Sequence, residues 1–176
     1  HPMIKKIIKK IFKIAGYNIN RISTNKYPYD IDNKHIKLYE EIEYATYTNI
    51  ERIDALLKAV NYLEKNNIEG DFVECGVWKG GSCMAMAKQL LENNSKSRKI
   101  WLFDTFEGMT EPDEIDVETE TGIKGKDLFN NSRKNTDKYN MWAYAPLNEV
   151  QNNMKKTGYP HDKFQYIIGK VEDTLK

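Results

Sequence analysis

The sequence predicts an α/β domain built on a parallel β-sheet, and three features support this prediction. Residues 71–75 are short and apolar-rich, as a buried strand is, and a glycine-rich turn follows them. A helical segment spans about residues 81–91, and residues 99–106 form a second strand-like segment. Residues 164–169 predict a third strand. The order strand, glycine turn, helix, strand predicts a right-handed parallel βαβ unit.

The composition limits the class of protein. A chain of 176 residues suits one domain with a real core, and 40% apolar with 30% charged residues indicate a globular fold. The net charge of +1 predicts no general attraction to nucleic acid. Cys75 and Cys83 have no zinc-ligand spacing with the histidines, and we expect neither a zinc site nor a disulfide scaffold. No apolar run approaches the roughly 20 residues of a membrane span, and we expect a reducing, cytoplasmic location.

The first residues predict an amphipathic helix over residues 4–14. Its apolar residues share one helical face and its lysines lie elsewhere: Ile4, Ile7, Ile8, Ile11 and Phe12 against Lys5, Lys6, Lys9, Lys10 and Lys13. Gly16 fits a helix end. We favour a helix that covers a core or a dimer surface, with peripheral contact to an anionic membrane as the alternative. Residues 17–36 are expected to be irregular, and residues 1–45 to form an arm before the main domain, residues 46–176.

Other segments carry helix and loop signals. Thr48 or Asn49 can cap a helix that ends before the first strand. Residues 147–156 predict another helix, and residues 171–176 begin a last one. Residues 107–135 are rich in acids, glycine, proline and asparagine without an apolar period. Because this stretch is too long for a plain connection, we expect a functional or mobile loop.

A turn rich in glycine separates the first strand from the helix behind it. Parallel sheets bind ligands beyond the carboxyl ends of their strands, where glycine lets the backbone approach closely. Gly76, Gly80 and Gly81 occupy this turn, and Ser82 is expected to cap the helix. The spacing E-x-G-x-x-x-G-G-S differs from the G-x-G-x-x-G fingerprint of nicotinamide cofactors, and no P-loop lysine follows the glycines. The turn therefore indicates a nucleotide-type site of another kind.

Two acids at strand ends indicate the cofactor. Glu74 lies at the end of the first strand, where a carboxylate repels a pyrophosphate but suits a cationic or amino-bearing ligand. S-adenosylmethionine carries a sulfonium and an α-amino group. Asp104 ends the second strand, where an acid can accept hydrogen bonds from both ribose hydroxyls, and Phe106 can lie against the adenine. We therefore predict S-adenosylmethionine as the cofactor.

These residues resemble the macrocin O-methyltransferase family, the sugar O-methyltransferases of macrolide and aminocoumarin biosynthesis and their relatives in bacterial polysaccharide clusters. The resemblance rests on VECGVWKGGS, LFDTFEGM and NNMKKTGYPHDKFQYIIGKVEDTL, and it covers roughly residues 45–175. It implies a class I, Rossmann-like methyltransferase fold. It also implies S-adenosylmethionine as methyl donor, Mg²⁺ as activator and a sugar or other small-molecule hydroxyl as acceptor.

The resemblance assigns roles to individual residues. Residues of the first strand and the turn would line the methionine and ribose side of the cofactor: Glu74, Gly76, Val77, Trp78, Gly80, Gly81 and Ser82. Asp104 and Phe106 would hold ribose and adenine. Glu172 and Asp173 would lie near the adenine end.

The resemblance covers two further segments of this sequence and places the catalytic residues of the family beyond it. Thr48 and Arg52 match a family stretch before the first strand, and the segment from residue 107 to about residue 140 would cover the acceptor. The metal-binding acids and the catalytic base of the family should follow Leu175. We therefore expect the amino-terminal part of a methyltransferase, truncated after the third strand and inactive alone. We assign it no metal ligand and no base, and expect Mg²⁺ only in the intact family member.

In the strand order that the family implies, the first strand lies at a sheet edge if the chain ends after the third strand and its helix. An open edge invites pairing with another chain. We therefore predict either a homo-oligomer formed through this edge or a marginally stable fragment.

Two alternatives to a methyltransferase remain. One is a non-catalytic module that binds S-adenosylmethionine. The other is a nicotinamide-dependent Rossmann enzyme, which the glycine spacing and Glu74 disfavour.

Overall fold

The computed structural model describes residues 2–17, 26–132 and 142–175. The chain divides into two compact units, residues 1–30 and residues 31–176, and each is described by itself. None of the described helices is long and apolar enough to cross a membrane.

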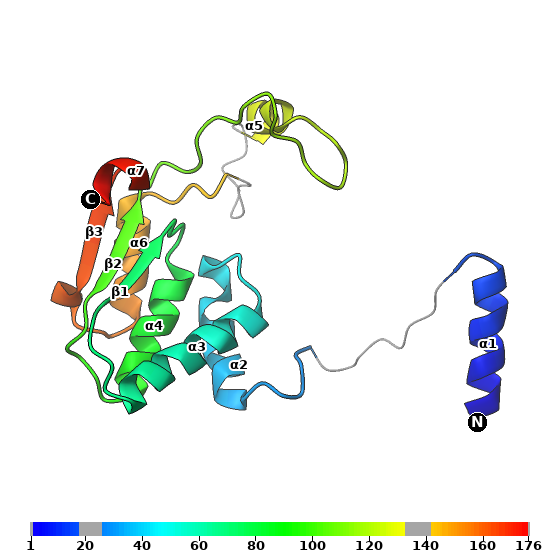
Figure 1. The fold of residues 1–176 in the computed structure, drawn as a ribbon, viewed down its shortest axis with the longest axis horizontal. Helices are drawn as coiled ribbons and strands as arrows, with labels where there is room; N and C mark the ends of the chain where they lie inside the picture. Colours follow the sequence, from blue (N-terminus) through cyan, green and yellow to red (C-terminus); the bar gives the residue numbers. More distant parts are fainter. Residues whose placement is uncertain (1, 18–25, 133–141, 176) are drawn as a thin grey trace. The chain divides into compact units, whose positions relative to one another are not determined.

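The larger unit is built on a three-stranded parallel sheet (Figure 1). Its strands are β1 (Phe72–Cys75), β2 (Ile100–Asp104) and β3 (Phe164–Ile168), in the order β1-β2-β3. The register pairs Cys75 with Phe103, and β2 pairs with β3 in the same direction. The carboxyl ends of the three strands therefore meet at one edge of the sheet, which confirms the predicted parallel arrangement.

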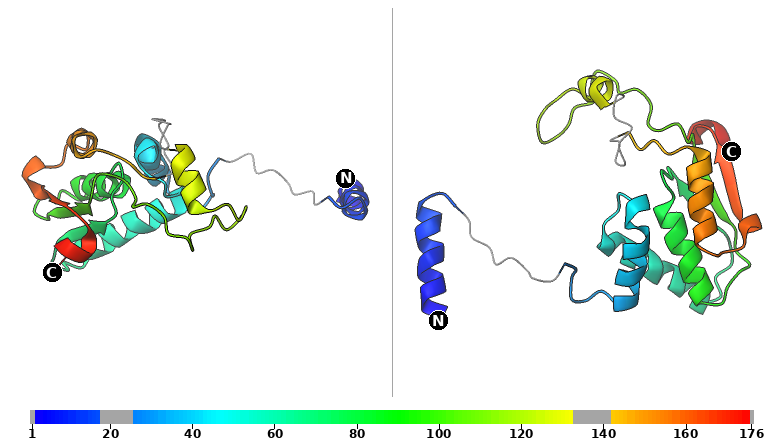
Figure 2. Two further views of the ribbon diagram at one scale, coloured as in Figure 1. Left: turned by 90° about the horizontal axis from the view of Figure 1, so that it is seen from above. Right: turned by 180° about the vertical axis from the view of Figure 1, so that it is seen from behind.

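Helices pack against this sheet and against one another. α4 (Gly81–Glu92) connects β1 to β2 and packs on β2, with α3 (Ile50–Lys65) and α6 (Leu147–Lys156) against it. The views of Figures 1 and 2 show α2 and α3 lying together beside α4. The other elements of this unit are α2 (Asn33–Ile42), the 3₁₀ helices η1 (Glu43–Ala45) and η2 (His161–Lys163), α5 (Gly125–Ser132) and α7 (Val171–Thr174).

The hydrophobic core surrounds α4. Leu57 of α3, Leu90 of α4 and Leu102 of β2 are fully buried, and Met154 of α6 belongs to the same cluster. Full burial of one such side chain stabilises the fold by about 1.5–3 kcal/mol. α4 is apolar on most of its faces because it lies between the sheet and the other helices. This packing fixes the position of the amino end of α4, where the glycine turn lies.

A buried polar contact joins α2 to α3. His35 Nδ1 lies 2.6 Å from Asp54 Oδ1, and both residues are buried. Lys58 Nζ lies 2.6 Å from the other carboxylate oxygen of Asp54. Burial alone would raise the pKa of Asp54, but its hydrogen bonds with Lys58 and His35 outweigh burial and lower it. Asp54 is therefore a carboxylate that holds α2 in place.

Most predicted elements are confirmed. The amphipathic helix of the first residues is α1 (Pro2–Ile14), and the helices predicted around α3, α4, α6 and α7 are present. Asn49 caps α3, since its side chain accepts a hydrogen bond from the backbone N–H of Arg52 at 3.2 Å.

Two expectations about irregular segments are wrong in part. Residues 17–36 were expected to be irregular, yet α2 begins at Asn33, after Asp32 accepts a hydrogen bond from the backbone N–H of Lys34. α5 lies inside the stretch expected to be a loop. The larger compact unit begins at Ile31 and so includes α2. The domain boundary expected after residue 45 stays a prediction.

The edge strand β1 supports a prediction about association. Among the described strands β1 pairs with β2 alone, and the side chain of Val73 on it is 55% exposed. We expect the chain either to self-associate through this edge or to be a marginally stable fragment. Where it associates, Val73→Lys should weaken the association, because edge lysines disfavour strand pairing. Size-exclusion chromatography with light scattering measures the oligomeric state of the unmodified chain and of the variant. A stable monomer at high concentration, for the unmodified chain, would contradict the prediction.

Candidate functional site

The glycine turn lies between the carboxyl end of β1 and the amino end of α4. Gly76 has φ +83°, a left-handed conformation that favours glycine, and a Cβ added there would meet no atom within 4 Å. Gly80, at φ +87°, is the N-cap residue of α4. Gly81 is constrained by contact, since an added Cβ would lie 2.5 Å from Thr46 Cβ and 2.6 Å from the carbonyl oxygen of Ala45. The turn is therefore open at Gly76 and tightly packed at Gly81.

Asp104 at the carboxyl end of β2 holds this turn in place. Its Oδ2 accepts hydrogen bonds from the backbone N–H groups of Val77 at 2.6 Å and Trp78 at 3.2 Å. Its Oδ1 accepts a third from the backbone N–H of Phe106 at 2.8 Å. The hydroxyl of Thr105 also lies 3.5 Å from Oδ1, and because a carboxylate offers about four acceptor positions, the protein itself engages most of them. The predicted grip on both ribose hydroxyls would compete with the turn and stays a prediction.

Glu74 lies beside the turn with neutral donors around it. The thiol of Cys83 donates to Glu74 Oε2 at 2.8 Å, and the hydroxyl of Ser82 also bonds to it. Burial raises the pKa of Glu74 above its usual 4.5 and the nearby carboxylate of Asp104 adds to this, while the bonds from Cys83 and Ser82 partly offset it. Burial and the neighbouring Glu74 raise the pKa of the Cys83 thiol well above its usual value. The thiol therefore stays protonated and donates to the acid.

Trp78 presents a buried polar group at the turn. It is 7% exposed, has φ +48°, and its ring stacks on that of Tyr47 with centroids 3.8 Å apart. Its indole Nε1 is buried and has no hydrogen-bond partner among the described residues. A buried donor without a partner costs about 1–3 kcal/mol, and a bound ligand or water would satisfy it.

Comparison with known protein families identifies the chain. The family model described as macrocin-O-methyltransferase (TylF) matches residues 8–176. The chain belongs to the macrocin O-methyltransferase family.

Individual members of the family match over a shorter range. The 8-demethyl-8-(2,3-dimethoxy-alpha-L-rhamnosyl)-tetracenomycin-C 4'-O-methyltransferase of Streptomyces olivaceus is 30% identical over 132 residues, which are 74% of this chain and 46% of that protein. The demethyldecarbamoylnovobiocin O-methyltransferase of Streptomyces niveus is 28% identical over 131 residues, 74% of this chain and 45% of that protein. The chain thus spans about half the length of the curated relatives it matches.

A solved structure supports the fold. The O-methyltransferase NovP matches with a TM-score of 0.56 and 27% identity, over 74% of this chain and 50% of that one. The three parallel strands with their helices therefore belong to the Rossmann-like fold of class I methyltransferases.

Two of the predicted site residues of this macrocin O-methyltransferase family member, Ser82 and Phe106, make contacts within the protein. Ser82 does not cap α4, because Gly80 is the N-cap and Ser82 lies within the first turn of the helix, bonded to Glu74. Phe106 is 5% exposed and packs in the core, with its ring 6.5 Å from that of Tyr166. Its contact with adenine stays a prediction.

The acids predicted near the adenine end lie at the same sheet edge as the turn. Glu172 and Asp173 are exposed in the first turn of α7, which follows β3 and packs near β2 (Figure 1). The backbone N–H of Gly169 donates to the carbonyl oxygen of Asp104 at 3.0 Å. The structure thus brings α7 close to Asp104, and a ligand contact from either acid stays a prediction.

Asn153 is a polar residue that supports the turn and that was not predicted from the sequence. Asn153 is 2% exposed, and its amide donates to the backbone carbonyl of Lys79 at 2.9 Å. Tyr44 and Lys156 donate to the amide oxygen of Asn153. Its position beside Met154 on the buried face of α6 was the available signal, since a polar residue there needs partners.

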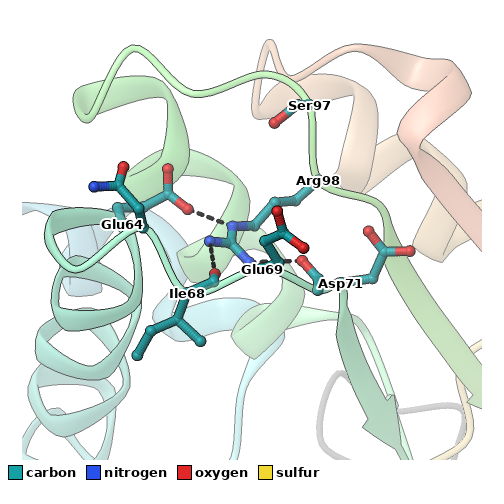
Figure 3. Close-up of a pocket in the computed structure, with 8 residues that line it drawn as sticks. Glu64, Ile68, Glu69, Asp71, Ser97 and Arg98 are labelled. Carbon is teal, nitrogen blue, oxygen red and sulfur yellow. Dashed lines mark hydrogen bonds and ion pairs between the residues drawn. The ribbon is translucent and has the colours of Figure 1, made fainter.

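A hollow at the amino ends of the strands contains an arginine with a structural role. It encloses about 540 Å³, and Figure 3 shows Arg98 at its centre. The guanidinium donates to the carboxylate of Glu64 and to the backbone carbonyls of Ile68 and Gly70. Through these bonds Arg98 joins two loops. Because its guanidinium is already engaged, we do not assign the functional site to this hollow.

The described residues do not fit a metal site. No group of three or more His, Cys, Asp or Glu side chains in the described ranges could hold a metal ion. The Mg²⁺ that the family resemblance implies therefore has no assigned ligands among the described residues.

Proposed function

We propose that this chain binds the methyl donor of an S-adenosylmethionine-dependent O-methyltransferase whose acceptor is a hydroxyl of a sugar or sugar-derived molecule. The observation that carries the proposal is the placement of Glu74 beside the open glycine turn, with Asp104 holding that turn from the next strand. Membership of the macrocin O-methyltransferase family supports the reaction class.

The charge of the site favours this donor over a dinucleotide. Glu74 is a carboxylate whose described hydrogen-bond donors, Cys83 and Ser82, are neutral. A cationic ligand would supply the missing counter-charge, whereas a pyrophosphate would be repelled. The unpartnered Nε1 of Trp78 and the open space at Gly76 leave a donor and room for a polar ligand at the turn.

The acceptor class is proposed from the relatives. The Streptomyces olivaceus protein is named as a methyltransferase of a rhamnosyl-tetracenomycin, and another relative, from Micromonospora griseorubida and 26% identical over 132 residues, as mycinamicin III 3''-O-methyltransferase. These relatives support methylation of a hydroxyl oxygen as the reaction, and the rhamnosyl group named for the first of them supports a sugar-borne hydroxyl as the acceptor.

The mechanism assigns binding and positioning to this chain. When bound, S-adenosylmethionine would supply an electrophilic methyl group for transfer to an acceptor hydroxyl oxygen. Glu74 would hold the amino end of the donor through a charge-assisted hydrogen bond. Asp104 fixes the backbone of Val77 and Trp78, so the turn that faces the donor is ordered before binding. Such positioning supplies a large part of the acceleration in a group transfer.

The proposal predicts which ligand the chain binds. Isothermal titration calorimetry should show binding of S-adenosylhomocysteine and none of NAD. Glu74→Gln should weaken that binding about tenfold at neutral pH, since a charged hydrogen bond becomes a neutral one. Glu69→Gln, an exposed glutamate just before β1, is the matched control and should change nothing. Binding of NAD, or equal affinity of the Glu74→Gln variant, would contradict the proposal.

The raised pKa of Glu74 predicts opposite trends for binding and folding. As the pH falls from neutral, Glu74 takes up a proton at a pH above its usual 4.5, and affinity for S-adenosylhomocysteine should fall there. Because the pKa of Glu74 is raised in the folded state, its protonated form favours folding. This contribution is present at low pH and is lost as the pH rises through the raised pKa. Glu74→Gln should therefore keep or slightly raise the thermal midpoint at neutral pH, as differential scanning calorimetry can show.

A further inference from the structure

The first unit differs in charge from the rest of the chain. Residues 1–30 hold seven basic residues and one acid, a net charge of +6, whereas residues 31–176 hold 20 basic and 25 acidic residues, a net charge of −5. The segment of α1 contains five of the lysines and no acid. Such asymmetry is typical of a segment that binds an anionic surface.

Within the described part of its own compact unit, the same helix has apolar side chains that nothing covers. Ile7, Ile11 and Ile14 are 53%, 59% and 81% exposed, and Ile8 and Phe12 are each 43% exposed. Residues 7, 8, 11 and 14 recur at helical spacing and so share one face. An apolar stripe of this kind needs a partner that offers an apolar environment.

An anionic membrane surface meets both requirements at once. Nucleic acid would satisfy the positive charge but would leave the isoleucine face in water. A protein surface would cover the isoleucines but would engage the lysines only where acidic side chains border its apolar patch. A lipid interface offers headgroup phosphates and acyl chains at adjacent depths, and short amphipathic basic helices lie in it.

We propose that α1 binds peripherally to a membrane that contains anionic lipid, with its isoleucine face among the acyl chains and its lysines at the headgroups. The helix lies in the interface and does not cross it, which agrees with its length and composition. Each basic residue near such a surface adds about fivefold to the affinity. The proposal is independent of the donor site, because it concerns the other compact unit.

Vesicle co-sedimentation of the full chain tests the proposal. The chain should sediment with vesicles of phosphatidylcholine and phosphatidylglycerol, should remain in solution with phosphatidylcholine alone, and should be released by salt. Lys10→Glu with Lys13→Glu, and separately Ile11→Asp, should each weaken the binding by about tenfold or more.

Matched controls place the same changes elsewhere. Lys34→Glu with Lys37→Glu makes the same charge change on exposed positions of α2, and Ile115→Asp removes an isoleucine that is 86% exposed. Both controls should keep nearly full binding to the anionic vesicles. All variants should also keep their affinity for S-adenosylhomocysteine, so failure here is separable from failure of the proposed function.

Several results would overturn the proposal. One is equal sedimentation with both kinds of vesicle, or with neither. Another is a control pair that weakens binding as much as the α1 variants do. A third is binding of a DNA duplex that Ile11→Asp leaves unchanged, together with no binding to vesicles. A fourth is a dimer in light scattering that Ile11→Asp dissociates, again without vesicle binding.

Discussion

Replacing Asp104 by alanine is expected to lower the free energy of unfolding by about 3 kcal/mol and to remove binding of S-adenosylhomocysteine. The carboxylate accepts hydrogen bonds from the backbone N–H groups of Val77, Trp78 and Phe106. Each buried donor left without an acceptor costs about 1–3 kcal/mol, and part of that cost is recovered where water enters. Urea unfolding and calorimetric titration measure the two effects.

A neighbouring acid and a changed ligand separate the two roles of Asp104. Glu107→Ala removes an exposed carboxylate close in sequence and should change the unfolding free energy by no more than about 0.5 kcal/mol. A 2′,3′-dideoxyribose analogue of S-adenosylhomocysteine tests the ribose contact without altering the turn. If Asp104→Ala were as stable as Glu107→Ala, its role in holding the turn would be refuted.

Gly81→Ala is the second substitution with a large expected effect. The added Cβ would lie 2.5 Å from Thr46 Cβ and 2.6 Å from the carbonyl oxygen of Ala45. The backbone of η1 cannot move aside as a flexible side chain can. We therefore expect the amino end of α4 to shift and the free energy of unfolding to fall by about 2–3 kcal/mol. Affinity for S-adenosylhomocysteine should fall as well, since the turn is attached to that end.

The control for Gly81 is a glycine that has a left-handed backbone conformation but open space around it. Gly122 has φ +71° and nothing within 4 Å of an added Cβ. Gly122→Ala should therefore lose only about 1 kcal/mol. A Gly81→Ala variant as stable as Gly122→Ala, in the same urea titration, would show that the contact with Ala45 and Thr46 is not a constraint.

The elements that the sequence predicted well are those with a strong period or a clear boundary. The strands around Phe72 and Ile100 are short and apolar with the glycine turn between them, and α6 has a regular apolar stripe. α2 was missed because its buried face includes His35, which is stable there only through its contact with Asp54 of α3. α5 was missed because its eight residues are too few to show a period.

The positions of the candidate site residues were predictable, but their contacts were not. Glu74 and Asp104 could be placed at one sheet edge because parallel strands end together. That Asp104 accepts from the backbone of Val77 could not be read from the sequence, because the two residues are brought together only by the pairing of β1 with β2. The bond from Cys83 to Glu74 likewise depends on how α4 leaves the turn.

A crystal structure of the chain with S-adenosylhomocysteine would show directly whether the donor binds at the glycine turn. We expect a ligand at the carboxyl ends of β1 and β2, with its amino group at the carboxylate of Glu74 and its body along the turn from Gly76 to Gly80. A ligand bound elsewhere, such as in the hollow around Arg98, or a ligand at the turn that leaves Glu74 without contact, would contradict this expectation.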